Sequence, residues 1–179
     1  AGYQGGVIGA RFAELVRCPV AIPPAIVSLT GITAEMIKDA RPVSEVLADF
    51  LEFLPPGAPC LAHHGSFDRA FLRVASKEKF KSLVLDTVEL SRICFPQLSS
   101  HSLAFLRDAL GLGSGGAHRA LGDCESLLAL WQKLLERMLE IPAPAVAAMR
   151  RLLEGSRHPY ADLFRRLEAE ILTIRFGSV

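Results

Sequence analysis

The stretch Ala62-His63-His64-Gly65-Ser66-Phe67-Asp68-Arg69-Ala70-Phe71-Leu72 decides the fold prediction. The apolar residues 59–63 before it are typical of a short buried strand, and Ser66 is expected to cap the helix that follows. A strand that leads directly into a helix is typical of an α/β protein. The apolar face of the helix is predicted to consist of Phe67, Ala70, Phe71 and Val74.

Asp68 lies in the first turn of this predicted helix, next to its apolar face. A helix N-terminus favours a negative charge, so a stabilising surface carboxylate is one interpretation. A bound metal ion is the other, because a carboxylate at the rim of a core needs a partner. This segment alone leaves both open.

A second polar segment reads His118-Arg119-Ala120-Leu121-Gly122-Asp123-Cys124-Glu125, at the start of a long helix predicted over residues 119–140. Five residues turn an ideal helix by about 500°, so His118 and Asp123 would lie about 140° apart if both were helical. The preceding Gly-rich loop, residues 113–116, instead predicts that His118 lies before the helix and can turn toward Asp123. A surface His with a solvated Asp is the alternative.

Outward from these segments, the pattern alternates strands and helices. Before residue 59 we expect a hairpin of Tyr3-Gln4 and Val7–Val16 around Gly5-Gly6, a loop through Pro19, Pro23 and Pro24, a short helix that Thr33 caps through Lys38, and a helix over 43–54. After residue 75 we expect a strand at Leu83-Val84-Leu85, a helix capped by Asp86, a helix closed by Gly111, and helices near 145–154 and 160–171.

Length and composition are those of a folded domain. The chain has 179 residues, of which 50% are apolar and 22% charged, and 20 Lys and Arg nearly balance 19 Asp and Glu. This length suits one globular domain of about 100–200 residues, and the apolar share excludes a disordered chain. Charged residues and Pro interrupt every apolar run before the roughly 18 residues that cross a bilayer, so we expect a cytoplasmic protein without a membrane partner. A net charge of +1 provides no argument for nucleic acid.

The four cysteines stand singly at positions 18, 60, 94 and 124 and are predicted to be reduced, mostly buried thiols. A zinc site with His63, His64 and His118 is disfavoured because no Cys lies at ligand spacing. A Cys60 nucleophile beside His63 is disfavoured because no third group orients the pair.

The two polar segments, in this order and spacing, resemble the DnaQ-like 3′–5′ exonucleases, the histidine-bearing branch of the four-carboxylate exonucleases with a ribonuclease-H-like fold. The resemblance extends to Leu29-Thr30-Gly31-Ile32-Thr33 with Met36, to Leu85-Asp86-Thr87 with Leu90 and Arg92, and to His101-Ser102-Leu103. It implies an α/β fold in which a mixed sheet of about five strands is flanked by helices. Residues 1–140 would form the exonuclease domain and residues 141–179 a helical C-terminal extension.

The resemblance implies hydrolysis of the terminal phosphodiester of DNA, with release of nucleoside 5′-monophosphates. Two divalent cations, Mg²⁺ or Mn²⁺, would serve the reaction. Asp68 and Asp123 match metal ligands, and His118 matches the general base. Leu29, Thr30, Gly31, His63 and Phe67 match positions beside the terminal nucleotide. The implied partners are single-stranded or 3′-terminal DNA, with RNA as the alternative, and a fused or associated helicase, polymerase or other nuclease domain.

The chain departs from the family pattern at two places. His64 stands where relatives usually carry Asn, which puts the usual polar contact there in question. The Asp-x-Glu motif of the family's first strand has no match, because Ala1-Gly2 aligns with the strand after it, and Asp86 and Glu89 are three residues apart and match another family position. Two of the four metal-binding carboxylates are therefore absent.

These departures bear on activity. We expect at most one cation and little or no nuclease activity in the 179 residues, and a parent enzyme whose first strand precedes Ala1. The alternative is a catalytically dead module for nucleic-acid binding or scaffolding.

A basic cluster surrounds the helix that carries Asp68. It consists of Arg69, Arg73, Lys77, Lys79 and Lys81. Two interpretations remain open: a surface for the DNA backbone and a solvated face.

Overall fold

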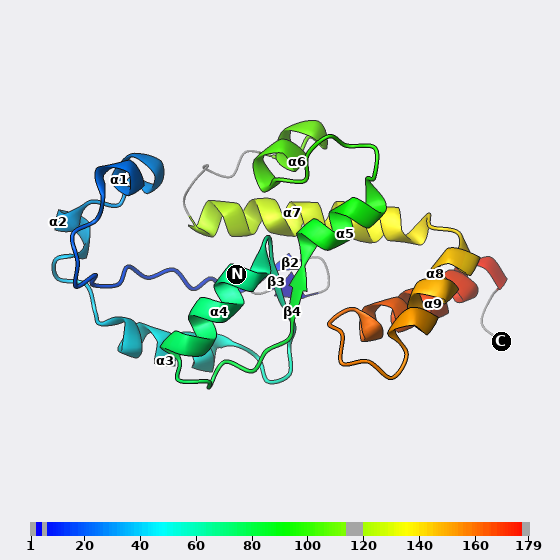
Figure 1. Ribbon diagram of the computed structural model, residues 1–179, viewed down its shortest axis with the longest axis horizontal. Helices are drawn as coiled ribbons and strands as arrows, with labels where there is room; N and C mark the ends of the chain where they lie inside the picture. Colours follow the sequence, from blue (N-terminus) through cyan, green and yellow to red (C-terminus); the bar gives the residue numbers. More distant parts are fainter. Residues whose placement is uncertain (1–2, 5–6, 114–119, 177–179) are drawn as a thin grey trace.

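A long helix, α7 (Ala120–Leu139), runs through the middle of the molecule, and other elements pack on both sides of it (Figure 1). The structure is a computed structural model that describes residues 3–4, 7–113 and 120–176. Leu130, Leu134 and Met138 of α7 are completely buried. Around them lies one hydrophobic core that includes Leu90 of α5 (Thr87–Cys94) and Leu106 of α6 (Leu103–Ala109).

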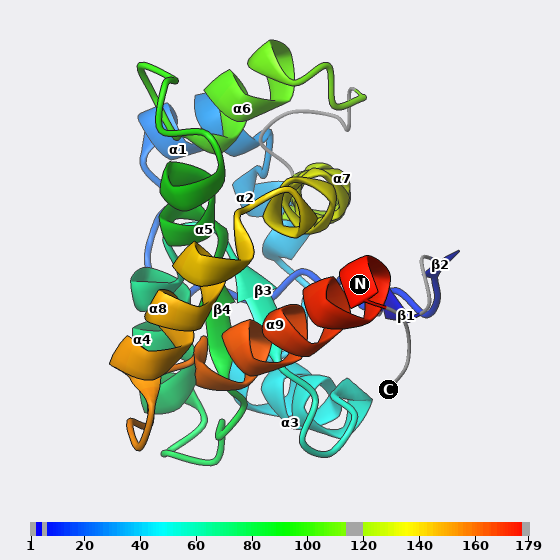
Figure 2. The same cartoon turned by 90° about the vertical axis from the view of Figure 1, so that its right-hand side faces the viewer.

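The described strands form two small sheets. β1 (Tyr3–Gln4) pairs with β2 (Val7–Ile8) antiparallel, which confirms the predicted hairpin, although the second strand ends long before Val16. β3 (Cys60–Ala62) pairs with β4 (Val84–Asp86) in parallel, with Leu61 opposite Leu85. The α/β class is confirmed, but the described strands do not join into one sheet of about five, because the hairpin lies away from β3 and β4 (Figure 2).

Three helices precede β3. They are α1 (Pro24–Thr30), α2 (Ala34–Ile37) and α3 (Val43–Phe53). The loop predicted through Pro24 is wrong: Pro24 occupies the first helical turn, where a missing N–H costs nothing, and Gly31 ends α1 with a φ of 68°. The Thr33 cap is confirmed, since its side chain accepts a hydrogen bond from the Met36 N–H.

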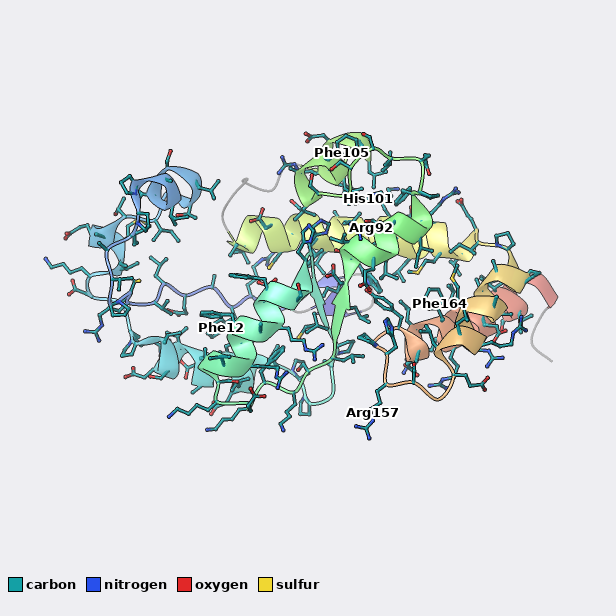
Figure 3. The ribbon with its side chains drawn as sticks, viewed as in Figure 1. Phe12, Arg92, His101, Phe105, Arg157 and Phe164 are labelled. Atoms are coloured by element: carbon teal, nitrogen blue, oxygen red, sulfur yellow. The ribbon has the colours of Figure 1, made fainter. Side chains whose placement is uncertain are left out.

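The extended segment between β2 and α1 is attached to α3 by aromatic packing. The ring of Phe12 lies 5.7 Å from that of Phe50 and 5.6 Å from that of Phe53, centroid to centroid (Figure 3). Val16 adds a single parallel bridge to Arg41. This contact replaces the continuous second strand that the apolar residues up to Val16 predicted.

Helix α4 (Gly65–Ala75) differs from its prediction in two ways. Ser66 is not its cap, because the helix begins at Gly65 and the N-cap residue is His64, two residues before Ser66. The predicted apolar face is not buried, since Phe67 and Val74 are each 76% exposed and Phe71 is 56% exposed. Helical periodicity identifies an apolar face, but burial also needs a partner surface, and no described element covers this one.

The C-terminal helices α8 (Ala143–Leu153) and α9 (Ala161–Phe176) pack against each other at one end of α7 (Figure 1). Val146, Tyr160, Phe164, Leu167 and Ile171 are buried in the same core as α5, α6 and α7. The domain boundary predicted at residue 140 falls in the turn between α7 and α8 and stays a prediction. No helix in the described part of the chain is long and apolar enough to cross a bilayer.

Candidate active site

The carboxyl ends of β3 and β4 lie side by side, and the Asp86 side chain organises them. Its Oδ1 atom accepts hydrogen bonds from the N–H groups of Val88 (3.0 Å) and His64 (3.1 Å), and its Oδ2 atom accepts one from Gly65 N–H (2.9 Å). The first contact is the predicted cap of α5. The other two show that the same carboxylate also binds the start of α4, so one residue fixes two helix N-termini at one strand end.

The turn from β3 into α4 demands unusual backbone geometry. His64 has a φ of 63° and a ψ of 43°, a left-handed conformation that Asn and His adopt more readily than most residues. At Gly65 a Cβ atom would lie 2.9 Å from both Ala62 Cβ and Val84 Cγ1, so only glycine fits. This geometry explains how His can stand at the position where the family resemblance implies Asn: the backbone conformation there suits both residues.

The His63 ring is held at both nitrogens. Nε2 lies 2.9 Å from the His101 carbonyl oxygen, which can only accept, so Nε2 carries the proton and donates it. Nδ1 lies 2.9 Å from Oγ1 of Thr87, whose hydroxyl also lies within hydrogen-bond distance (3.2 Å) of the Ala62 carbonyl oxygen. Burial lowers the pKa of His63, and the bond to His101 opposes this in part. His63 therefore joins β3, the start of α5 and the segment before α6, and its predicted contact with substrate stays a prediction.

The two carboxylates predicted to bind metal come from the first turns of two different helices. Asp68 is exposed on α4, and Asp123 is half-buried on α7. The pKa of the half-buried Cys124 thiol is raised, chiefly by burial, and the charges of Asp123 and Asp68 raise it further. Both carboxylates therefore act electrostatically on the Cys124 thiol, and their role as metal ligands stays a prediction.

The predicted general base, His118, lies outside the described residues. Its role as a base stays a prediction.

The remaining predicted substrate contacts lie in two places. Phe67 is exposed beside Asp68 on α4. Leu29, Thr30 and Gly31 lie at the end of α1, where Thr30 Oγ1 donates to the Ile26 carbonyl (2.8 Å) within its own helix. Among the described residues no hydrogen bond or ion pair links these three to α4 or α7, and α1 lies at the left edge of the molecule in Figure 1.

A family model described as "Exonuclease" matches residues 2–131 of the chain. The chain belongs to the DnaQ-like exonuclease family. This assignment agrees with the strand-to-helix turn at Asp86 and with carboxylates in the first turns of α4 and α7.

Relatives and a solved structure agree with the family. The chain is 33% identical over 169 residues to the 3′–5′ exonuclease DinG of Bacillus subtilis, covering 92% of this chain and 18% of that protein. It is 34% identical over 139 residues to the DNA polymerase III subunit epsilon of Aquifex aeolicus, covering 75% of this chain and 68% of the subunit. The structure resembles that of exonuclease X in complex with 5′ overhanging duplex DNA, with a TM-score of 0.57, 25% identity, and coverage of 69% and 71% of the two chains.

The family resemblance implies two divalent cations, and the acidic residues of the chain limit how many it can bind. Within the described residues, no group of three or more His, Cys, Asp or Glu side chains could hold a metal ion. Two hard cations at one site need more carboxylates than Asp68 and Asp123 supply. Two carboxylates could supply ligands for at most one Mg²⁺, because this ion is commonly held by one or two carboxylates, with water and substrate phosphate completing its shell.

The cysteines do not offer a competing chemistry. All four are free, which confirms the prediction of unpaired thiols. The prediction that they are mostly buried is wrong, because only Cys94 is buried, Cys60 and Cys124 are half-buried, and Cys18 is exposed. Burial raises the pKa of Cys60 and brings that of Cys94 to about 11. A thiol is a nucleophile only as its thiolate, so Cys60 beside the fully bonded His63 is not an activated nucleophile.

Two residues that organise the site escaped the sequence analysis in whole or part. Asp86 was predicted to cap α5, but its bonds to the start of α4 were missed, although an Asp after a strand that adjoins a second strand-to-helix turn was the available signal. Tyr160, whose hydroxyl bonds the Asp86 backbone, was missed completely, because nothing in the local pattern of the C-terminal tail indicates a contact with β4.

Proposed function

We propose that the protein is a 3′–5′ exonuclease that removes nucleoside 5′-monophosphates from the 3′ end of DNA. The feature that supports this proposal is the placement of Asp68 and Asp123 in the first turns of α4 and α7, at the positions for which the family resemblance implies metal ligands. Membership of an exonuclease family supports hydrolysis of a phosphodiester as the reaction. DNA is favoured over RNA because the relatives include a DNA polymerase subunit and the similar solved structure contains DNA.

In this proposal Asp68 and Asp123 hold one Mg²⁺ or Mn²⁺, which would neutralise charge on the scissile phosphate. His118 takes the proton from the attacking water, a role that suits a side chain titrating near neutral pH. Phe67 offers an exposed ring next to Asp68 on which the terminal base can stack. His63 keeps in place the turn that leads into α4, which carries Phe67 and Asp68.

The end of α1 completes the proposed substrate site. Leu29 is half exposed, and Gly31 leaves the backbone open to close approach. We infer that Leu29, Thr30 and Gly31 lie beside the terminal nucleotide when DNA is bound.

The proposal includes weak activity for the 179 residues. With two carboxylates the chain lacks the ligands for a second cation, which would otherwise stabilise the leaving oxygen. Strong activity would need further acidic ligands. The fold itself does not depend on them, because the core around α7 is formed by apolar side chains.

We also propose that the exonuclease works beside another domain or subunit. The chain spans only 18% of DinG, and epsilon is by name a subunit of a DNA polymerase. An associated helicase, polymerase or other nuclease domain would supply DNA with a free 3′ end.

The second candidate function is a catalytically dead module that binds nucleic acid. The absence of a three-ligand group among the described residues favours it. Such a module would keep the DNA contacts and would not hydrolyse the phosphodiester.

The test is the digestion of a 5′-labelled 20-nucleotide single strand in Mn²⁺. The 179-residue chain is compared with the protein encoded by the full open reading frame that contains it. We expect slow shortening from the 3′ end by the chain, release of 5′-monophosphates, and loss of cleavage with EDTA or with Asp68→Asn. Asp108→Asn, an exposed substitution on α6, is the matched control. Rapid digestion by the 179 residues would contradict the two-carboxylate account, and shortening that Asp68→Asn leaves unchanged would contradict the assigned site. Binding of the strand by both proteins without any cleavage would establish the second candidate.

A further inference from the structure

A basic pocket opens on the side of α4, near the start of β4. Its volume is about 360 Å³, and its cationic lining comes from α4 (Arg69 and Arg73), from the segment before β4 (Lys81) and from the loop before α9 (Arg157). Two interpretations were open for Arg69, Arg73 and Lys81, a solvated face and a surface for the DNA backbone. Arg157 lies far away in the sequence, and Figure 3 shows that its side chain projects from the loop below β4.

The pocket has unbalanced positive charge. Glu78 is its only acidic lining residue among those described, and it is engaged by Arg73 at 2.6 and 2.9 Å. In the described part of the chain, Arg69, Lys81 and Arg157 form no ion pair and no side-chain hydrogen bond. Three exposed cations therefore face one opening in a chain whose net charge is only +1. Unpaired cations at a concave surface focus positive potential there.

Both walls of the pocket are anchored to the core. Phe80 is 4% exposed, and its N–H donates to Ser76 Oγ at 2.9 Å. On the other wall, Tyr160 follows the lining residue Pro159, is 4% exposed, and bonds the Asp86 backbone through its hydroxyl. The pocket is thus a preformed feature of the fold.

The ligand that suits this chemistry is a phosphodiester. Guanidinium groups bind phosphate oxygens in pairs, and ammonium groups bind them as point charges. Arg69 follows Asp68 directly, and Arg73 lies five residues along α4, about 7.5 Å from Asp68 along the axis.

We propose that this pocket binds the backbone of the nucleic-acid strand whose 3′ end lies at Asp68. The inference rests on the proposed exonuclease function and adds to it a second, non-catalytic contact with the same strand. Arg157 makes the C-terminal extension part of the substrate-binding surface. The alternative occupant is a free phosphate ion, which the same cations would bind without any nucleic-acid strand.

The test measures binding in EDTA, so that it does not depend on cleavage. Fluorescein-labelled oligothymidylates of 20 and 3 nucleotides are titrated with the 179-residue chain and with the double variant Lys81→Gln/Arg157→Gln. We expect the variant to bind the 20-mer about tenfold more weakly, and the slope of log K against log salt to fall by about 1.4, from two lost contacts at about 0.7 each. The 3-mer has only two internucleotide phosphates, so its binding is expected to weaken less than that of the 20-mer.

The matched control is Arg17→Gln/Arg151→Gln, which removes two exposed, unpaired cations outside the pocket, and thermal unfolding verifies that each variant folds. Equal loss of 20-mer binding in the pocket and control variants would overturn the inference and leave the proposed function intact. Absence of wild-type binding to either oligonucleotide would overturn both. Displacement of the 20-mer by millimolar inorganic phosphate only where the pocket is intact would assign the pocket to free phosphate. Loss of binding to phosphatidylserine vesicles, with 20-mer binding unchanged, would assign it to a membrane surface.

Discussion

The Tyr160 hydroxyl forms two hydrogen bonds with the backbone of Asp86: it donates to the carbonyl oxygen at 2.8 Å and accepts from the N–H at 3.1 Å. Tyr160 is 4% exposed, and burial together with Glu89 raises its pKa, so the phenol stays protonated at neutral pH. The residue before the last helix is thereby joined to the strand end that holds α4 and α5. The C-terminal helices thus contribute to the geometry of the candidate site.

Replacing Tyr160 with Phe removes this link while keeping the ring. We expect the free energy of unfolding to fall by about 1–3 kcal/mol, because buried polar backbone groups lose a partner. Urea unfolding measures the change. Thr173→Val, which removes an exposed hydroxyl on α9, is the control and should change stability by less than about 0.5 kcal/mol. A Tyr160→Phe protein as stable as the wild type would contradict the link.

Asp86 is predicted to be more important than an ordinary helix cap. Asp86→Ala removes the acceptor for three backbone N–H groups and should cost about 2–4 kcal/mol, roughly two caps, whereas Asp86→Asn keeps one acceptor oxygen and should cost less. Urea unfolding followed by circular dichroism provides both values. If the loss is no larger than for Asp108→Ala on the surface of α6, the double cap does not stabilise the fold.

Gly65 is predicted to be irreplaceable for steric reasons. Gly65→Ala would place a methyl group 2.9 Å from Ala62 and Val84, and should destabilise by about 1–3 kcal/mol through overpacking. Gly113→Ala is the matched control, because nothing lies within 4 Å of a Cβ there. Thermal unfolding measures the midpoints of both variants. Overpacking lowers only that of Gly65→Ala, whereas a general effect of replacing glycine would shift both midpoints equally.

His63 should make stability depend on pH. Because its pKa is lowered in the folded state, the unfolded chain binds the proton more readily, and stability is fully present above the ordinary His pKa of about 6.5 and declines as the pH falls below it. Urea unfolding of wild type and His63→Gln from pH 5 to 7.5 should show a smaller rise with pH in the variant. Parallel curves for the two proteins would mean that His63 is not the group responsible.

Much of the fold was predictable because local signals determined it. The periodicity of residues 43–54 and 119–140 predicted α3 and α7 closely, and the caps at Thr33 and Asp86 were identified from residue type. Local patterns failed where a distant partner decides the outcome. They could not show that Phe67 and Phe71 lack a covering surface, or that Tyr160 contacts β4.

The candidate site, too, was predictable only where local sequence signals determined it. The motif positions of Asp68 and Asp123 came from the sequence, and the structure places them in the first turns of α4 and α7. The role of Asp86 in holding α4, and the reason why His64 is tolerated, needed the backbone geometry of the turn.

The central claim is that Asp68 and Asp123 share one divalent cation. Electron paramagnetic resonance of Mn²⁺ titrated into the 179-residue chain measures this directly, with Asp108→Asn as the control. We predict a single weak site that is lost in Asp68→Asn and in Asp123→Asn and kept in the control. Mn²⁺ binding that both substitutions leave unchanged would contradict the account.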